Sequence, residues 1–131
     1  MLTREIRDMH LLNPSFSTRE LTVIAHQKAA KTFEGSATSV TLKVESDTLI
    51  STTNIGDSGY ALYHVVPKED GGFRIEQYFR SKEQQKAFNF PYQIGSRGDD
   101  PRRAGLDLTH EFTNGDVVLV YSDGVSDNLF D

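Results

Sequence analysis

The sequence contains no cysteine among its 131 residues. This absence excludes disulfide bonds, thiolate metal ligands and cysteine nucleophiles, and it leaves the redox compartment undetermined. Any metal ion bound by these residues must therefore be held by oxygen or imidazole ligands.

Long apolar runs and an excess of positive charge are also missing. No stretch is long enough to span a bilayer, and residues 1–10 have neither a hydrophobic signal core nor the acid-free composition of a transit peptide. The formal net charge is -5, and basic doublets such as Arg102-Arg103 form no continuous stripe. We expect no membrane span and no nucleic-acid partner. The oligomeric state stays open, and we expect an intracellular location, cytoplasmic or organellar.

The residues that are present indicate one folded domain or part of one. Hydrophobic residues make up 37% of the chain, which is enough to form a core at this length. Ser17 and Glu20 have the spacing of a capping box, and apolar residues then recur on one helical face. This pattern predicts a helix over residues 18–31.

Alternating apolar and polar residues predict strands over residues 36–44, 48–54, 60–66 and 73–79. Short turns join them, so we expect the three strands from residue 36 to residue 66 to form an antiparallel meander. Residues 81–107 look irregular and are interpreted as a lid or flap. Residues 117–121 (VVLVY) form a continuous apolar run, which predicts a strand buried on both faces.

Two aspartates share one kind of setting, because Asp57 and Asp123 each follow a predicted strand and lie beside glycine. Two such carboxylates could share a hard cation, and ligation by oxygen alone suits Mg²⁺ or Mn²⁺. On position alone, the favoured interpretation is that both are ordinary turn residues, since aspartate is a common turn former.

Four motifs in a fixed order carry a family resemblance. They are residues 35–38 (GSAT), 54–59 (NIGDSG), 81–94 (SKEQQKAFNFPYQI) and 115–128 (GDVVLVYSDGVSDN). Each alone is weak, but their order and spacing are hard to obtain by chance. The succession resembles the PP2C-type (PPM) metal-dependent serine/threonine phosphatases, closest to the eukaryotic branch with mitochondrial and plastid members. The match covers residues 18–131.

The resemblance implies an α+β fold, in which two antiparallel β-sheets form a sandwich flanked by helices. It also implies hydrolysis of phosphoserine and phosphothreonine in a phosphoprotein substrate by a metal-activated water, with two or more Mg²⁺ or Mn²⁺ ions in the complete domain. By resemblance, Asp123 is a core metal ligand and Asp57 helps to hold an additional, weaker ion. Ser58, Gly124 and Asp127 are expected to support these ligands, and no catalytic residue is assigned.

Departures from the family pattern limit what this chain is expected to do. No counterpart of the family's early acidic residue, phosphate-contacting arginine or Asp-Gly-x-Gly-Gly motif precedes residue 18, and no late metal aspartate follows. We therefore expect residues 1–131 to be a partial PP2C-like domain, incomplete at both ends and inactive alone, with sheet edges exposed to self-association. Lys86 also replaces the histidine usual in the third motif, and the four histidines of the chain receive no metal role.

Two alternatives remain open. The chain could be a non-catalytic PP2C-like module that binds a partner through its sheet and flap, as the missing ligands suggest. It could also be an unrelated small α+β binding domain in which the motifs occur by chance.

Overall fold

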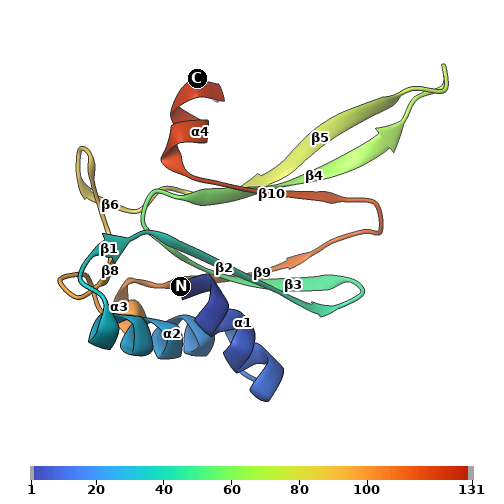
Figure 1. Cartoon of the computed structure of the whole chain (residues 1–131). Coiled ribbons are helices and arrows are strands. Elements are labelled where there is room, and N and C mark those ends of the chain that lie inside the picture. The colour runs from blue at the N-terminus through green and yellow to red at the C-terminus, as the bar shows by residue number, and fades with distance from the viewer. Residues whose placement is uncertain (1, 130–131) are drawn as a thin grey trace.

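Two antiparallel sheets stacked face to face dominate the computed structural model, which describes residues 2–129. One three-stranded sheet has the order β2-β3-β9 and the other the order β10-β4-β5. Helices α1 and α2 cover the outer face of the first sheet, and α4 lies on the far side of the second (Figure 1). The expected α+β sandwich is confirmed. Met1, Phe130 and Asp131, which belong to the expected domain range, lie outside the described residues.

Helix α2 (Thr18–Thr32) confirms the predicted helix and its capping box. The Ser17 hydroxyl accepts a hydrogen bond from the Glu20 backbone N–H, and the Glu20 carboxylate accepts one from the Ser17 N–H. Thr22 joins the helix to the first sheet through a 2.7 Å bond to the Thr41 hydroxyl. Helix α1 (Leu2–Leu12), which was not predicted, packs against α2. None of the helices within residues 2–129 has the length and apolar character that crossing a membrane requires.

The first sheet consists of β2 (Ser39–Ser46), β3 (Leu49–Ile55) and β9 (Leu106–Glu111). Strand β3 is central and pairs antiparallel with both neighbours. Because side chains alternate along a strand, Ile50 faces the interior of the sandwich, whereas Thr53 faces α2, where its hydroxyl bonds to that of Thr18.

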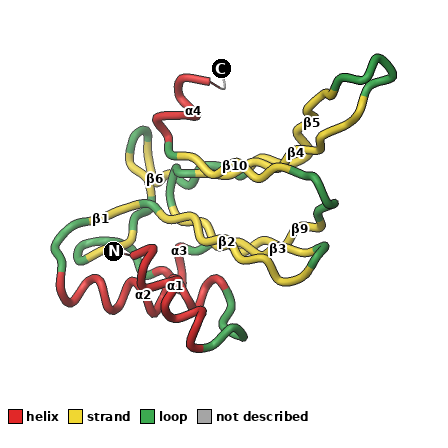
Figure 2. Tube along the Cα trace, turned by 45° about the vertical axis from the view of Figure 1, so that its right-hand side comes forward, coloured by secondary structure: helices red, strands yellow, loops and turns green. Residues whose placement is uncertain are grey.

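The second sheet consists of β10 (Val117–Tyr121), β4 (Gly59–Pro67) and β5 (Phe73–Arg80). The expected meander is therefore wrong, since β3 and β4 follow each other in the chain but belong to different sheets. The turn between them is a corner that carries the chain from one layer to the other. Figure 2 shows this corner closing one end of the sandwich, while the β4–β5 hairpin projects beyond the other end.

The segment interpreted as a lid or flap contains short regular elements. A small hairpin pairs β6 (Gln85–Ala87) with β7 (Phe90–Pro91), and β8 (Ile94–Gly95) pairs with β1 (Ser36–Ala37). A short helix, α3 (Pro101–Ala104), follows. The segment ends where β9 begins at Leu106, so the prediction that irregular chain extends to residue 107 is two residues too long.

The core lies between the two sheets and includes a buried polar group. Ile50, Tyr60 and Leu62 form its centre, and partly buried apolar side chains surround them. The Tyr60 hydroxyl is 2.8 Å from the Thr52 hydroxyl and 2.8 Å from His110 Nε2. Burial lowers the pKa of His110 because the apolar surroundings disfavour the charged imidazolium.

Replacing His110 with glutamine is expected to reduce the loss of stability on acidification. Above about pH 6.5 the imidazole is neutral in both states, so folding is not opposed. As the pH falls below that value, the unfolded chain takes up the proton first, and the native state loses stability until its own lowered pKa is reached. Thermal unfolding at about pH 7.5 and pH 5.5 measures the difference, and an equal acid-induced loss in both proteins would contradict this role.

Strand β10 was expected to be buried on both faces, and this prediction is wrong. It lies at the edge of its sheet, and Val117, Val118, Leu119 and Val120 are 38–52% exposed. The apolar composition predicts a strand here but does not show which elements pack against it. Within residues 2–129, β4 pairs with one edge of β10 and the other edge has no partner strand, so the backbone groups of that edge and the half-exposed apolar side chains face solvent.

Replacing Val120 with lysine is expected to suppress self-association of the chain. An exposed apolar edge strand is a template for pairing with another chain, and a charge placed on it opposes that pairing. Light scattering at increasing protein concentration measures the effect. Ile75→Lys is the control, because Ile75 is exposed on β5 at the opposite edge of the same sheet. An equal reduction by the control would show that β10 is not the strand responsible.

Candidate metal centre

The two aspartates singled out from the sequence leave the same end of one sheet. In the antiparallel pairing of β4 with β10, Gly59 lies opposite Tyr121. Asp57 comes two residues before Gly59, and Asp123 comes two residues after Tyr121. Figure 1 shows the β3–β4 corner and the start of α4 at this same end of the molecule.

Asp57 lies in the corner between the two sheets and is only 9% exposed. Among residues 2–129, no hydrogen bond or ion pair reaches its carboxylate. The residue is largely enclosed, but its carboxylate oxygens still reach solvent. The Asp57 carboxylate in this corner is therefore free to bind a cation.

The turn that carries Asp57 is tightly packed on both sides. Gly56 has a φ of +99°, and a Cβ atom on it would lie 2.4 Å from the Thr38 Cγ2 and 2.5 Å from the Tyr92 carbonyl oxygen. On the other side, the Ser58 hydroxyl is 2.6 Å from that of Thr38. Ser58 thus fixes the backbone that follows the acidic residue.

A second buried polar group lies close in sequence to Asp57. Asn54 is 2% exposed, and neither its amide nitrogen nor its amide oxygen has a partner in the described part of the chain. It shares a strand face with Ile50 and Thr52, which point between the sheets. Buried amides are nearly always hydrogen-bonded. The Asn54 amide is therefore available at this end of the sandwich to bind a ligand or a further polar group.

Asp123 is exposed and begins α4 (Asp123–Leu129). Its Oδ1 accepts a 2.8 Å hydrogen bond from the Gly124 N–H, and its carbonyl oxygen accepts one from the buried Ser126 hydroxyl. Asp127 is exposed one helical turn further on. Because α4 begins at Asp123, this residue lies in the first turn of the helix.

The donor set fits a hard cation held with water. No cluster of three or more His, Asp or Glu side chains occurs within residues 2–129, so a site here rests on Asp57 and Asp123. Mg²⁺ is commonly held by one or two carboxylates and keeps several waters, and Mn²⁺ takes similar oxygen ligands. Two carboxylates with nothing else support weak binding rather than a closed structural site.

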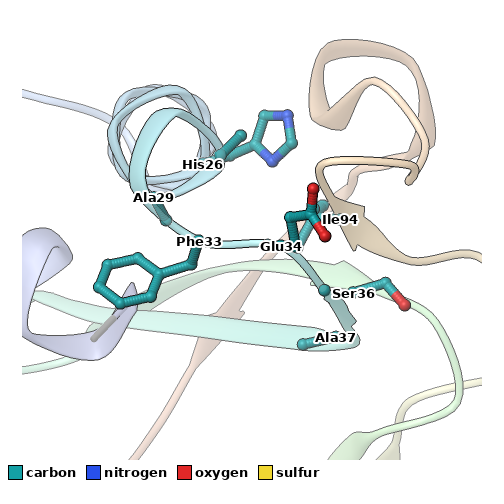
Figure 3. A pocket seen from close by; sticks show the side chains of 10 residues that line it. His26, Ala29, Phe33, Glu34, Ser36, Ala37 and Ile94 are labelled. Carbon is teal, nitrogen blue, oxygen red and sulfur yellow. The ribbon is translucent and has the colours of Figure 1, made fainter.

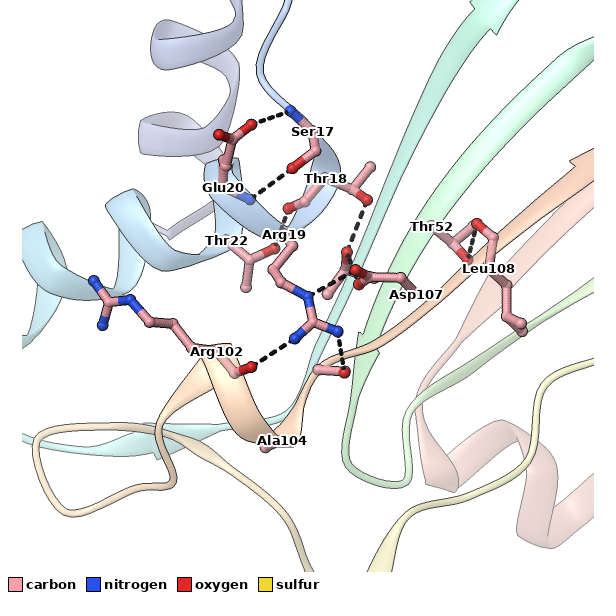
Figure 4. Close-up of polar contacts among 12 residues, drawn as sticks. Ser17, Thr18, Arg19, Glu20, Thr22, Thr52, Arg102, Ala104, Asp107 and Leu108 are labelled. Atoms are coloured by element: carbon pink, nitrogen blue, oxygen red, sulfur yellow. Dashed lines mark hydrogen bonds and ion pairs between the residues drawn. The ribbon is translucent and has the colours of Figure 1, made fainter.

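Arg19 fixes the segment that follows the small hairpin (Figure 4). Its guanidinium donates to Asp107 Oδ2 at 2.7 Å and to the carbonyl oxygens of Arg102 and Gly105 at 2.6 Å each. Asp107 also accepts a bond from the Thr53 hydroxyl through its other oxygen. Helix α2, strand β9 and the end of α3 are thereby joined at one guanidinium, and Asp107 links them to β3 through Thr53.

Lys86, which stands where the family has histidine, anchors the small hairpin. Its ammonium pairs with Asp99 and lies over the rings of Phe90 and Tyr92, 5.3 and 5.0 Å from their centroids. The Lys86 ammonium and the Gln93 N–H hold the pKa of the Asp99 carboxyl below its ordinary value. The substitution therefore has a structural role here and does not touch either aspartate of the candidate site.

A separate pocket of about 200 Å³ opens between the end of α2 and strands β1 and β8. Figure 3 shows the His26 ring and the Glu34 carboxylate on the side of Ile94, with the Phe33 ring turned away from them. Neither Asp57 nor Asp123 lines this pocket. It is distinct from the corner that holds the candidate ligands.

Comparison with known proteins gives a consistent set of relatives. The chain is 35% identical over 82 residues to Probable protein phosphatase 2C 71 of Oryza sativa subsp. japonica, covering 63% of the chain and 16% of that protein. It is 31% identical over 118 residues to Probable protein phosphatase 2C BIPP2C1 of the same plant, covering 90% and 18%. It is 36% identical over 99 residues to Probable protein phosphatase 2C 80 of Arabidopsis thaliana, covering 74% and 21%. No protein-family model matches the chain.

A solved structure covers nearly all of the fold. The X-ray structure of the photosystem II phosphatase PBCP superimposes with a TM-score of 0.80 and 26% identity, over 99% of this chain and 48% of that one. The chain belongs to the PP2C family. It spans about half of this solved PP2C structure and less than a quarter of the curated PP2C relatives described above.

The PP2C resemblance carried by the four motifs is thus confirmed, and the structure adds what those motifs do. The second and fourth motifs place Asp57 and Asp123 at one end of a sheet. The first and third motifs supply Thr38 and Gln84, which contact the Asp57 turn. Sequence reasoning singled out the aspartates but missed Gln84 and Asn54, although both lie inside quoted motifs.

Proposed function

We propose that these residues contribute to a metal-dependent protein serine/threonine phosphatase of the PP2C type. The observation that carries the proposal is the Asp57 carboxylate, which has no partner within residues 2–129 and lies at the sheet end from which Asp123 also leaves. The names of the plant relatives and of the solved neighbour support the same reaction class. The substrate would be a phosphoserine or phosphothreonine in a protein.

In this proposal, Asp57 and Asp123 hold divalent ions, Mg²⁺ or Mn²⁺, at the corner between the sheets. When bound, such ions neutralise charge on the phosphoryl group and make hydroxide available at neutral pH. Ser58 and Gly124 fix the backbone around the two ligands through their hydrogen bonds. Asp127 adds negative charge one turn along α4, which raises the local attraction for cations.

The compartment proposed is an organelle. The solved neighbour is named as a phosphatase of photosystem II, and photosystem II belongs to plastids. A phosphoprotein of a plastid or related organelle is therefore the substrate class to test first.

A chimera tests the proposed reaction directly. Residues 2–129 replace the matching half of the solved photosystem II phosphatase, since the two folds superimpose over 99% of this chain. Hydrolysis of a phosphothreonine peptide is measured with Mn²⁺ and with EDTA. We expect turnover that depends on Mn²⁺, whereas a folded chimera without turnover would overturn the proposal.

A non-catalytic module that binds a partner is the second candidate. It is favoured by the small donor set, because no third acidic or imidazole group joins the two aspartates within residues 2–129. The same chimera separates the two functions. A folded but inactive chimera, beside an active parent phosphatase, would favour binding over catalysis.

A further inference from the structure

Gln84 uses all of its hydrogen-bonding groups to join three parts of the chain. Its side-chain oxygen accepts a 3.0 Å bond from the Gly56 N–H, and its own N–H donates a 2.9 Å bond to the Gly56 carbonyl oxygen. Its carbonyl oxygen accepts from the Tyr92 N–H at 3.1 Å. Its side-chain nitrogen donates to the Ala104 carbonyl oxygen at 3.3 Å.

The two bonds to Gly56 matter most, because Gly56 immediately precedes Asp57. Together they hold the peptide groups on both sides of Gly56, whose φ of +99° lies in the region that favours glycine. A backbone held at both its donor and its acceptor has little freedom to rotate. The direction in which the Asp57 carboxylate leaves the turn is therefore set in part by Gln84.

Through its bond to Ala104, Gln84 also connects the Asp57 turn to the end of α3. Arg19 binds the carbonyl oxygens of Arg102 and Gly105, on either side of Ala104. The carbonyl groups at the end of α3, which lack partners within the helix, are thus satisfied by two side chains. Gln84 is consequently held at its far end while its near end holds Gly56.

We propose that Gln84 is a positioning residue for Asp57, which sets the affinity of the ion that Asp57 would hold. The inference deepens the proposed function and depends on it for the ion. Groups that orient metal ligands from outside the ligand set commonly change metal affinity by about 10–100-fold when removed. Gln84 acts through the backbone of the turn and does not touch the ion itself.

The test is a Mn²⁺ titration of the ¹⁵N-labelled chain, followed by NMR. Paramagnetic broadening of the amide signals of residues 56–58 gives an apparent dissociation constant, and amide exchange of Gly56 reports its hydrogen bond. Gln84→Met keeps the length of the side chain but removes its donor and acceptor. We expect the apparent dissociation constant to rise about tenfold and Gly56 exchange to accelerate.

Gln85→Met is the matched control, because it makes the same change at the next residue. In the described part of the chain, the Gln85 side chain bonds only to the Glu83 carboxylate on the surface. We expect wild-type affinity and wild-type Gly56 exchange in this variant. Equal weakening by the two methionine variants would overturn the positioning role.

Gln84→Glu keeps the test decisive if the methionine variant does not fold. Its carboxylate still accepts from the Gly56 N–H but cannot donate to Ala104, so we expect Gly56 exchange to stay slow and the Mn²⁺ affinity to fall by less than about tenfold. Fast Gly56 exchange combined with wild-type affinity would overturn the proposal.

Failure of the inference differs visibly from failure of the proposed function. If Asp57→Asn removes the broadening and Gln84→Met leaves it unchanged, only the role of Gln84 is wrong. If the wild-type chain shows no broadening at residues 56–58, or Asp57→Asn does not alter it, the metal role of Asp57 is wrong and both proposals fall.

Discussion

Replacing Asp123 with asparagine should lower the Mn²⁺-dependent activity of the chimera by at least about 100-fold, because a metal ion contributes several kcal/mol to stabilising the transferred phosphoryl group. Asparagine keeps the size of the side chain and an oxygen that can accept the Gly124 N–H bond. The start of α4 should therefore survive, and the loss should reflect the missing charge. Initial rates at saturating Mn²⁺ and with a fixed phosphopeptide measure it.

Two further variants are compared with Asp123→Asn in the same assay. Asp57→Asn is expected to reduce activity less, by about tenfold, because Asp57 is assigned to the weaker ion. Asp70→Asn is the control: Asp70 caps an exposed turn by accepting the Gly72 N–H, far from the β3–β4 corner. Activity of the Asp123 variant within twofold of the control would contradict a ligand role.

Replacing Gly56 with alanine should destabilise the fold by about 3 kcal/mol or more. Two costs add here. A left-handed backbone costs an L-residue about 1–2 kcal/mol, and the added Cβ would overlap the Thr38 side chain at 2.4 Å and the Tyr92 carbonyl oxygen at 2.5 Å. Because the Tyr92 oxygen is backbone, rotation of a side chain cannot relieve both overlaps. Urea unfolding monitored by circular dichroism gives the difference in free energy.

Gly115→Ala separates the two costs. Gly115 has a similar φ of +95°, but an added Cβ there meets no atom within 4 Å. This variant should lose only the backbone cost, about 1–2 kcal/mol. Equal destabilisation of the two variants would show that the packing around Gly56 contributes nothing.

Local signals in the sequence predicted individual elements well. The capping box of Ser17 and Glu20 located the start of α2 because capping depends on neighbouring residues alone. Period-two patterns located β2, β3, β4 and β5 within a few residues. Strand β9 was missed although Leu106, Leu108 and His110 alternate, because its first two residues were attributed to the flap and the rest received no assignment.

These patterns could not predict which strands pair with each other. Alternation shows that one face of a strand is buried but does not name its neighbour, so β3 and β4 were placed in one sheet instead of two. The apolar composition of β10 likewise predicted burial, which depends on what packs against the strand.

The candidate site was predicted as far as its aspartates. Position after a strand and beside glycine indicated Asp57 and Asp123, and their metal role remains a prediction. Gln84 could not be found in this way, because its contacts to Gly56 and Ala104 link residues that are distant in sequence. Only the fold reveals which glutamine of a Gln-Gln pair faces the turn.

The way in which β9 and β10 complete the two sheets has a consequence for folding kinetics. Hairpins β2–β3 and β4–β5 are local and can form early, but each remains two-stranded until a strand from the last quarter of the chain arrives. Since β9 and β10 are joined by residues 112–116, one docking event adds a strand to both layers at once. Closing such long loops slows folding, so this event is the natural rate-limiting step.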